Sequence, residues 1–94
     1  MKLLMLIVDE EKKEELEVFL KHAGVAGYTE LPRAIGVGAS GPRLGSGAFP
    51  RTSAVIFTLL GEAEVEQVTG KIKAYCHDCG ERLKMVVWSV EAVV

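Results

Sequence analysis

The chain has 94 residues, of which 49% are hydrophobic and 26% charged, and its formal net charge is −2 at neutral pH. This composition argues against intrinsic disorder, and the length predicts a single domain over residues 1–94. The weak negative charge gives no general attraction to nucleic acid or to anionic membranes. A chain this short buries only part of its surface alone, so the high apolar content favours burial against another subunit.

The beginning of the chain predicts no export or membrane insertion. Residues 3–8 are apolar, but a signal-peptide core needs about 7–15 apolar residues followed by a cleavage site. No stretch approaches the roughly 20 apolar residues of a membrane span. We therefore expect a cytoplasmic protein without a disulfide framework.

The first element is predicted to be a strand over residues 2–8, because a short continuous apolar run is typical of a strand buried on both faces. A helix is expected next, over residues 10–23, since apolar residues recur there at helical spacing. Asp9 is predicted to cap the start of this helix, and Gly24 to end it.

The middle of the chain predicts two strands joined by a glycine-rich segment. Residues 26–33 are expected to form an edge strand, because Pro32 cannot pair within the centre of a sheet. Residues 34–51 contain five glycines and two prolines and are predicted to be a long, flexible loop, of a length that is usually functional or disordered. Residues 53–60 form a second apolar run and predict a buried strand.

The last part predicts a helix and a strand. Apolar residues at helical spacing favour a second amphipathic helix over residues 62–79. Gly70 lies inside it, which suggests a close approach to the sheet there. Residues 83–91 are predicted to be the final strand.

The element order is therefore β-α-β-β-α-β. This order is that of the ferredoxin-like α+β fold, an antiparallel sheet with two helices on one face, in which the first and third strands are central. Those two strands are apolar on both faces, and so is the last strand. A sheet with helices on one face only would leave the other face open, which predicts oligomerisation through it.

The glycine-rich segment is a candidate anion site. Glycines let backbone N–H groups converge on a phosphate, and arginines supply positive charge. The candidate residues are Gly36, Gly38, Ser40, Gly41 and Arg43. The alternative is a mobile loop that becomes ordered on a protein partner.

Arg82 and Lys84 follow the second predicted helix and are candidates for contact with a phosphate or carboxylate across a subunit cleft. The alternative is a solvated start to the last strand. No nucleophile–base pair is suggested by spacing, and the carboxylates of Asp9 to Glu11 fit a solvated helix surface.

Cys76, His77 and Cys79 leave three alternatives open. The cysteines continue the apolar stripe of the second helix, which favours core packing. A metal site would need a further ligand or a second subunit. A redox pair is disfavoured near a helix C-terminus, where the dipole opposes a thiolate.

The sequence Gly27-Tyr28-Thr29, followed by Gly36-Val37-Gly38 and Gly41, resembles the PII-type signalling proteins and their PII-like relatives. The resemblance implies a homotrimer whose sheets face inward. It also implies clefts between subunits that commonly bind adenine nucleotides, and a "T-loop" that contacts a transporter or an enzyme. The loop is short for a PII protein and lacks the glutamine and lysine that typically follow Gly38, so the chain looks like a PII-like protein rather than a nitrogen-sensing one.

Three hypotheses follow. The first is a non-enzymatic, trimeric PII-like regulator that needs no cofactor and binds a small anionic effector, with the loop contacting a protein partner. The second is a divalent-metal-binding protein of the CutA type that uses Cys76, His77 and Cys79. The third is a small enzyme with its active site at a subunit cleft.

Overall fold

The computed structural model describes residues 1–38, 41–75 and 83–94. In chain order the described elements are β1 (Lys2–Asp9), the 3-10 turn η1 (Glu10–Lys12), α1 (Lys13–His22), β2 (Thr29–Ala34), β3 (Gly36–Gly38), β4 (Gly41–Arg43), β5 (Ser53–Leu60), α2 (Glu62–Tyr75) and β6 (Leu83–Ser89).

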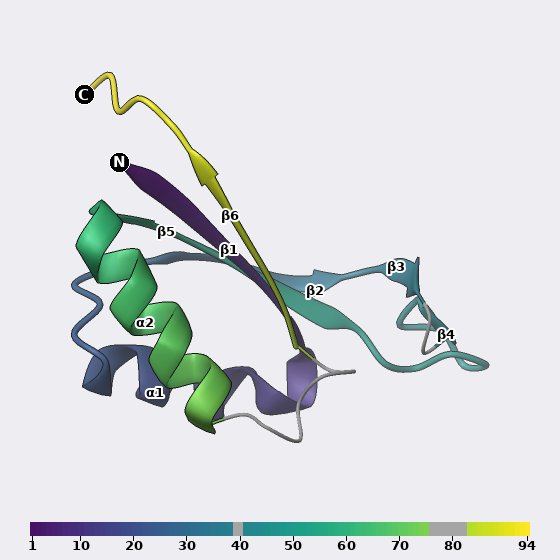
Figure 1. The fold of residues 1–94 in the computed structure, drawn as a ribbon. Coiled ribbons are helices and arrows are strands. Elements are labelled where there is room, and N and C mark those ends of the chain that lie inside the picture. The colour runs from purple at the N-terminus through teal and green to yellow at the C-terminus, as the bar shows by residue number, and fades with distance from the viewer. Residues whose placement is uncertain (39–40, 76–82) are drawn as a thin grey trace.

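The main sheet is antiparallel and has the strand order β2-β5-β1-β6. Figure 1 shows α1 and α2 together on one of its faces. The predicted ferredoxin-like α+β fold is therefore confirmed. The first and third predicted strands, β1 and β5, are central, and Pro32 lies in the edge strand β2 as expected.

The core lies between the sheet and the two helices. Alternate residues of β1 and β5 face the helices because successive side chains of a strand point to opposite faces. Burial of each large aliphatic side chain stabilises the fold by about 1.5–3 kcal/mol. The core residues are Leu4, Leu6, Val8, Leu16, Leu20, Ala54, Ile56, Leu60, Val65, Val68 and Ile72.

Three local predictions about the helices have different outcomes. Gly24 does follow α1 in a left-handed conformation, with φ +90°. The capping role of Asp9 was wrong, because its side chain makes no capping hydrogen bond and the chain enters α1 through the turn η1. The close approach at Gly70 was also wrong, because this glycine is exposed and an added Cβ would meet no described atom within 4 Å.

The segment between β2 and β5 is predicted to be one long, flexible loop, but part of it forms a second small sheet. Strands β3 and β4 pair antiparallel as a small hairpin, with Gly36 opposite Arg43 and Gly38 opposite Gly41. A turn follows β4, in which the N–H of Leu44 and that of Ser46 both donate to the carbonyl of Phe49. The hairpin projects beyond the main sheet (Figure 1).

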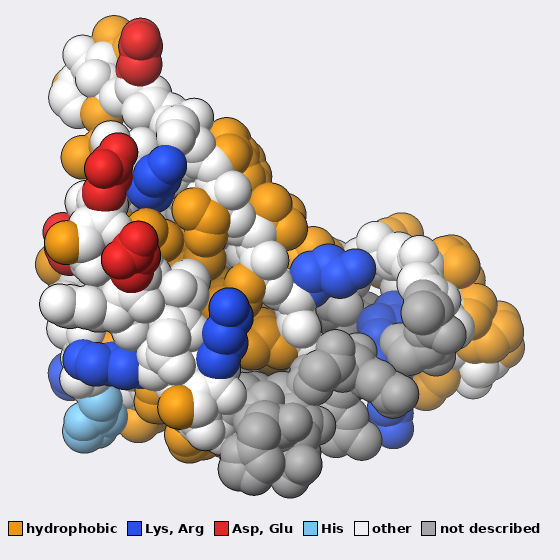
Figure 2. Space-filling model, in the orientation of Figure 1, with side chains coloured by type: hydrophobic (Ala, Val, Ile, Leu, Met, Phe, Trp, Pro, Cys, Tyr) orange, Lys and Arg blue, Asp and Glu red, His pale blue; other side chains and the backbone are white. Residues whose placement is uncertain are grey.

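The face of the main sheet opposite the helices is apolar, as the strand pattern predicts. In Figure 2, hydrophobic side chains gather on the side of the sheet that faces away from the helices. No described element of the chain covers this open face, and Trp88 is 41% exposed on it. The pairing register places Leu3, Met5, Ile7, Leu31, Val55, Phe57, Leu59, Val86 and Trp88 there.

Candidate anion site at the base of the hairpin

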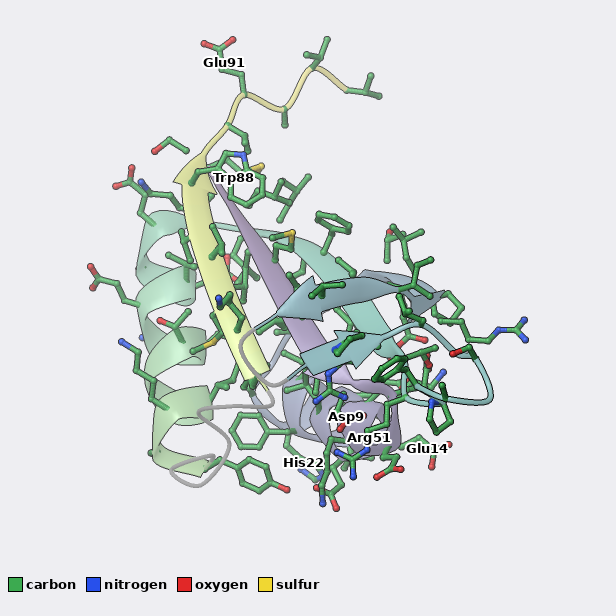
Figure 3. All side chains as sticks on the ribbon, turned by 90° about the vertical axis from the view of Figure 1, so that its right-hand side faces the viewer. Asp9, Glu14, His22, Arg51, Trp88 and Glu91 are labelled. Carbon is green, nitrogen blue, oxygen red and sulfur yellow. The ribbon has the colours of Figure 1, made fainter. Side chains whose placement is uncertain are left out.

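Asp9 brings two arginines together where β1 ends. Its Oδ2 lies 3.2 Å from Nη1 of Arg43 and 3.9 Å from Nη1 of Arg51. Asp9 is only 3% exposed, so its charge is buried and needs cationic partners. Figure 3 shows Asp9 and Arg51 close together beneath the hairpin, far from Trp88 at the other end of the sheet.

Glu10, the next residue, holds both ends of the 34–51 segment. Its Oε1 accepts a hydrogen bond of 2.6 Å from the backbone N–H of Arg33 and one of 3.3 Å from the hydroxyl of Thr52. Arg33 has φ +53°, a left-handed conformation that is unusual for a residue with a side chain. The hydrogen bond from its N–H to Glu10 supports this turn, which lies at a register shift in β2.

The ionisation of Glu10 is coupled to these contacts. Burial acts to raise the pKa of its carboxyl, but the hydrogen bonds from Arg33, Lys13 and Thr52 and the charge of Lys13 together outweigh burial and lower that pKa. Lys13 lies 3.3 Å from both Glu10 and Glu30, and its own pKa is raised chiefly by these two carboxylates. The base of the hairpin is therefore a connected charged network.

The predicted glycine cradle is only partly described. Gly36, Gly38 and Gly41 lie in the hairpin, and Gly36 pairs with Arg43. Gly41 has φ +103°, which explains the glycine there. Ser40 lies outside the described residues.

Of the second predicted pair, Lys84 is described and Arg82 lies outside the described residues. Lys84 is exposed and pairs with Ile7, so it lies on the open face. Asp9 lies two residues further along β1 than Ile7, so the two residues belong to the same face of the strand. The fold thus brings Lys84 and Arg43 to the same end of the sheet.

Cys76, His77 and Cys79 also lie outside the described residues, so their packing and metal-binding alternatives stay predictions. Among the residues that are described, no group of three His, Cys, Asp or Glu side chains is arranged to hold a metal ion. No helix in the described part of the chain is long and apolar enough to cross a membrane.

Sequence reasoning missed Asp9 and Glu10 as site residues. Both were assigned to a helix start and a solvated surface, because acidic residues before a helix are usually found there. The signal that could have found them is that two carboxylates directly follow a central strand while the glycine-rich segment carries Arg43 and Arg51 and no acidic residue. A carboxylate that is buried at the end of a strand needs a positively charged partner such as an arginine.

The sequence matches the family described as nitrogen regulatory protein P-II over residues 1–94. The chain belongs to the P-II family. The resemblance seen in the glycine motifs is thereby confirmed. Proteins of the P-II family are trimeric signalling regulators.

Solved structures support the P-II assignment at the level of the fold. The chain is 22% identical to CPII from Thiomonas intermedia K12 bound to ADP and bicarbonate, with a TM-score of 0.79 over 97% of this chain and 86% of that one. The apo form of that PII-like protein is 19% identical, with a TM-score of 0.72 over 97% and 89% of the two chains. No match was found among curated proteins.

Proposed function

We propose that the chain is a non-enzymatic PII-like regulator that acts in the cytoplasm as a homotrimer of one domain, residues 1–94. The open apolar face of the sheet supports the trimer, because a contiguous exposed apolar patch favours burial against another subunit. The effector is a small anion, such as an adenine nucleotide or bicarbonate, bound in clefts between subunits at the base of the hairpin.

The observation that carries this proposal is the convergence of Arg43 and Arg51 beside a glycine hairpin in a P-II chain. Guanidinium groups bind phosphate and carboxylate groups with two parallel hydrogen bonds. The CPII structures bound to ADP and bicarbonate, and to ADP, AMP and bicarbonate, support this ligand class. The proposed ligand-binding residues are Gly36, Gly38, Ser40, Gly41, Arg43, Arg82 and Lys84.

Segment 34–51 is proposed to contact a protein partner, a transporter or an enzyme. Its apolar side chains are exposed: Ile35 is 67% and Val37 77% exposed, and Leu44 and Phe49 are more than 40% exposed. Exposed apolar residues on a projecting segment are typical of a surface that becomes buried on binding. Effector binding would change how this segment is presented.

Thermal unfolding in the presence of ADP, AMP or bicarbonate tests the effector. A ligand at about 100 times its Kd stabilises the folded state by about 2.7 kcal/mol. We expect stabilisation of the natural chain and its loss in Arg43→Gln. Lys71→Gln is the control, because Lys71 is exposed on α2. If none of the three ligands stabilises the natural chain, the proposed effector class is wrong.

A further inference from the structure

The contact between Asp9 and Arg43 places a carboxylate where the proposed effector would bind. Arg43 reaches back from β4 to the end of β1, and its side chain is 15% exposed while that of Asp9 is 2% exposed. The carboxylate therefore lies beside the guanidinium group, at a position that an external oxyanion bound to Arg43 would need. The hairpin and the main sheet are joined through this ion pair.

The ion pair between Asp9 and Arg43 is incompletely satisfied. Although Nη1 of Arg43 lies 3.2 Å from Oδ2 of Asp9, it has no aligned hydrogen bond to any described residue. Oδ1 of Asp9 is likewise buried without a hydrogen-bond partner among the described residues. Removing charges from water is costly, and a pair with unmet hydrogen bonds recovers only part of that cost. An anion with several oxygens can satisfy more of the donors of Arg43.

Arg51 offers Asp9 a second partner. Its Nη1 lies 3.9 Å from the same Oδ2, and its side chain is 54% exposed. If Arg43 leaves, Asp9 need not remain as an unpaired buried charge, because a small movement of Arg51 restores an ion pair. Glu10 meanwhile keeps both ends of the segment in place through Arg33 and Thr52.

We propose that Asp9 is an internal competitor of the effector. In the free chain Asp9 pairs with Arg43; when a small oxyanion binds Arg43, it displaces Asp9, which then pairs with Arg51. This rests on the proposed function, because it needs an anion at Arg43. The exchange releases the hairpin from β1 without freeing the ends of the segment. Asp9 thereby links effector binding to the position of the surface offered to the partner.

Equilibrium binding of ADP and of bicarbonate to the full chain tests the exchange. If Asp9 occupies Arg43 nine-tenths of the time, its removal strengthens binding about tenfold. We expect that gain for Asp9→Asn. Glu11→Gln is the matched control, because it removes a neighbouring charge from an exposed side chain. Equal gains in both variants would indicate general electrostatics and overturn the proposal.

Two further outcomes separate this proposal from the proposed function. If the natural chain binds a probe and Asp9→Asn binds it no more tightly, Asp9 is not a competitor and the proposed function stands. If neither chain binds either probe, both proposals fail. Should Asp9→Asn not fold, hydrogen exchange of the natural chain decides: saturating bicarbonate should speed exchange at the amides of β3 and β4, and unchanged exchange would overturn the proposal.

Discussion

At the residue scale, one carboxylate just after β1 joins the start of α1 to two parts of the chain that are distant in sequence. Glu10 contacts the backbone of Arg33, the hydroxyl of Thr52 and the ammonium group of Lys13. Hydrogen bonds to charged groups stabilise a fold more than neutral ones do. The position of the hairpin therefore depends on a residue that lies outside it.

We expect Glu10→Gln to lower the free energy of unfolding by about 1–2 kcal/mol, because the amide keeps an acceptor but loses the charge that strengthens it. Urea unfolding at matched protein concentration measures this. Glu11→Gln is the control, since Glu11 is exposed. Equal stability of the two variants would show that the contacts of Glu10 contribute little.

The pH dependence follows from the lowered pKa of Glu10. The contribution of this carboxylate is complete above its unfolded pKa, near 4.5, and is lost as the pH falls through the lower folded value. We expect the stability difference between the natural chain and Glu10→Gln to shrink below pH 4.5. Urea unfolding across that range measures it, and a difference that stays constant or grows would contradict the assignment.

The residues of the site could be only partly predicted from the sequence. Arg43 and the glycines are candidates from the sequence, because their chemistry suits an anion in any arrangement, and they stay a prediction. The predicted capping role of Asp9 is wrong, because a local pattern says nothing of a cation that arrives from residue 43. Glu10 does lie in the first turn, but its contacts with Arg33 and Thr52 could not be predicted from that turn. Contacts between distant segments depend on tertiary packing, which no short sequence window contains.

At the element scale, the hairpin of β3 and β4 shows that glycine-rich strands can escape prediction from the sequence. Gly36, Gly38 and Gly41 all have poor strand propensity, and a segment rich in glycine and proline predicts a long, flexible loop. Pairing of Gly38 with Gly41 nevertheless brings the two strands together. The glycine at position 41 is needed for its backbone conformation, whereas the one at position 38 has an ordinary φ.

Substitutions of Gly41 and Gly38 test whether the hairpin needs a glycine at each position. Gly41→Ala places a side chain at φ +103° and should destabilise the hairpin by about 1–2 kcal/mol. Gly38→Ala should change it little, because an added Cβ there meets no described atom within 4 Å. Limited trypsin cleavage after Arg43 measures opening of the hairpin. Cleavage at the same rate in both variants would show that backbone strain at Gly41 does not govern it.

At the scale of the whole molecule, the sheet could be predicted almost completely. The central strands β1 and β5 are the most apolar runs, and a proline in β2 assigns it to an edge. The pattern of apolar and polar residues and the positions of glycine and proline are enough to predict these strands, because both signals lie within each strand or next to it. The second apolar face was also visible in the sequence, since β1 and β5 do not alternate with polar residues.

The proposed trimer predicts that a charge on the open face prevents assembly. Phe57 lies at the centre of β5 on that face, opposite Met5. We expect Phe57→Asp to dissociate the proposed trimer to monomers, because that interface would bury a carboxylate without a partner. Sedimentation velocity measures this. Val18→Asp is the control, since Val18 is 58% exposed on α1, and a trimer that survives both changes would contradict this interface.

The pairing of β1 also has a consequence for how the chain folds. Residue 2 pairs with residue 60 on one side and with residue 89 on the other, so β1 completes its pairing only when two distant segments of the chain have reached it. Closing such long loops is entropically costly, and non-local strand pairing makes folding slow. Until β6 pairs, the apolar strand β1 has an open edge. A folding intermediate in which β1 is paired with β5 alone is therefore expected to be prone to aggregate.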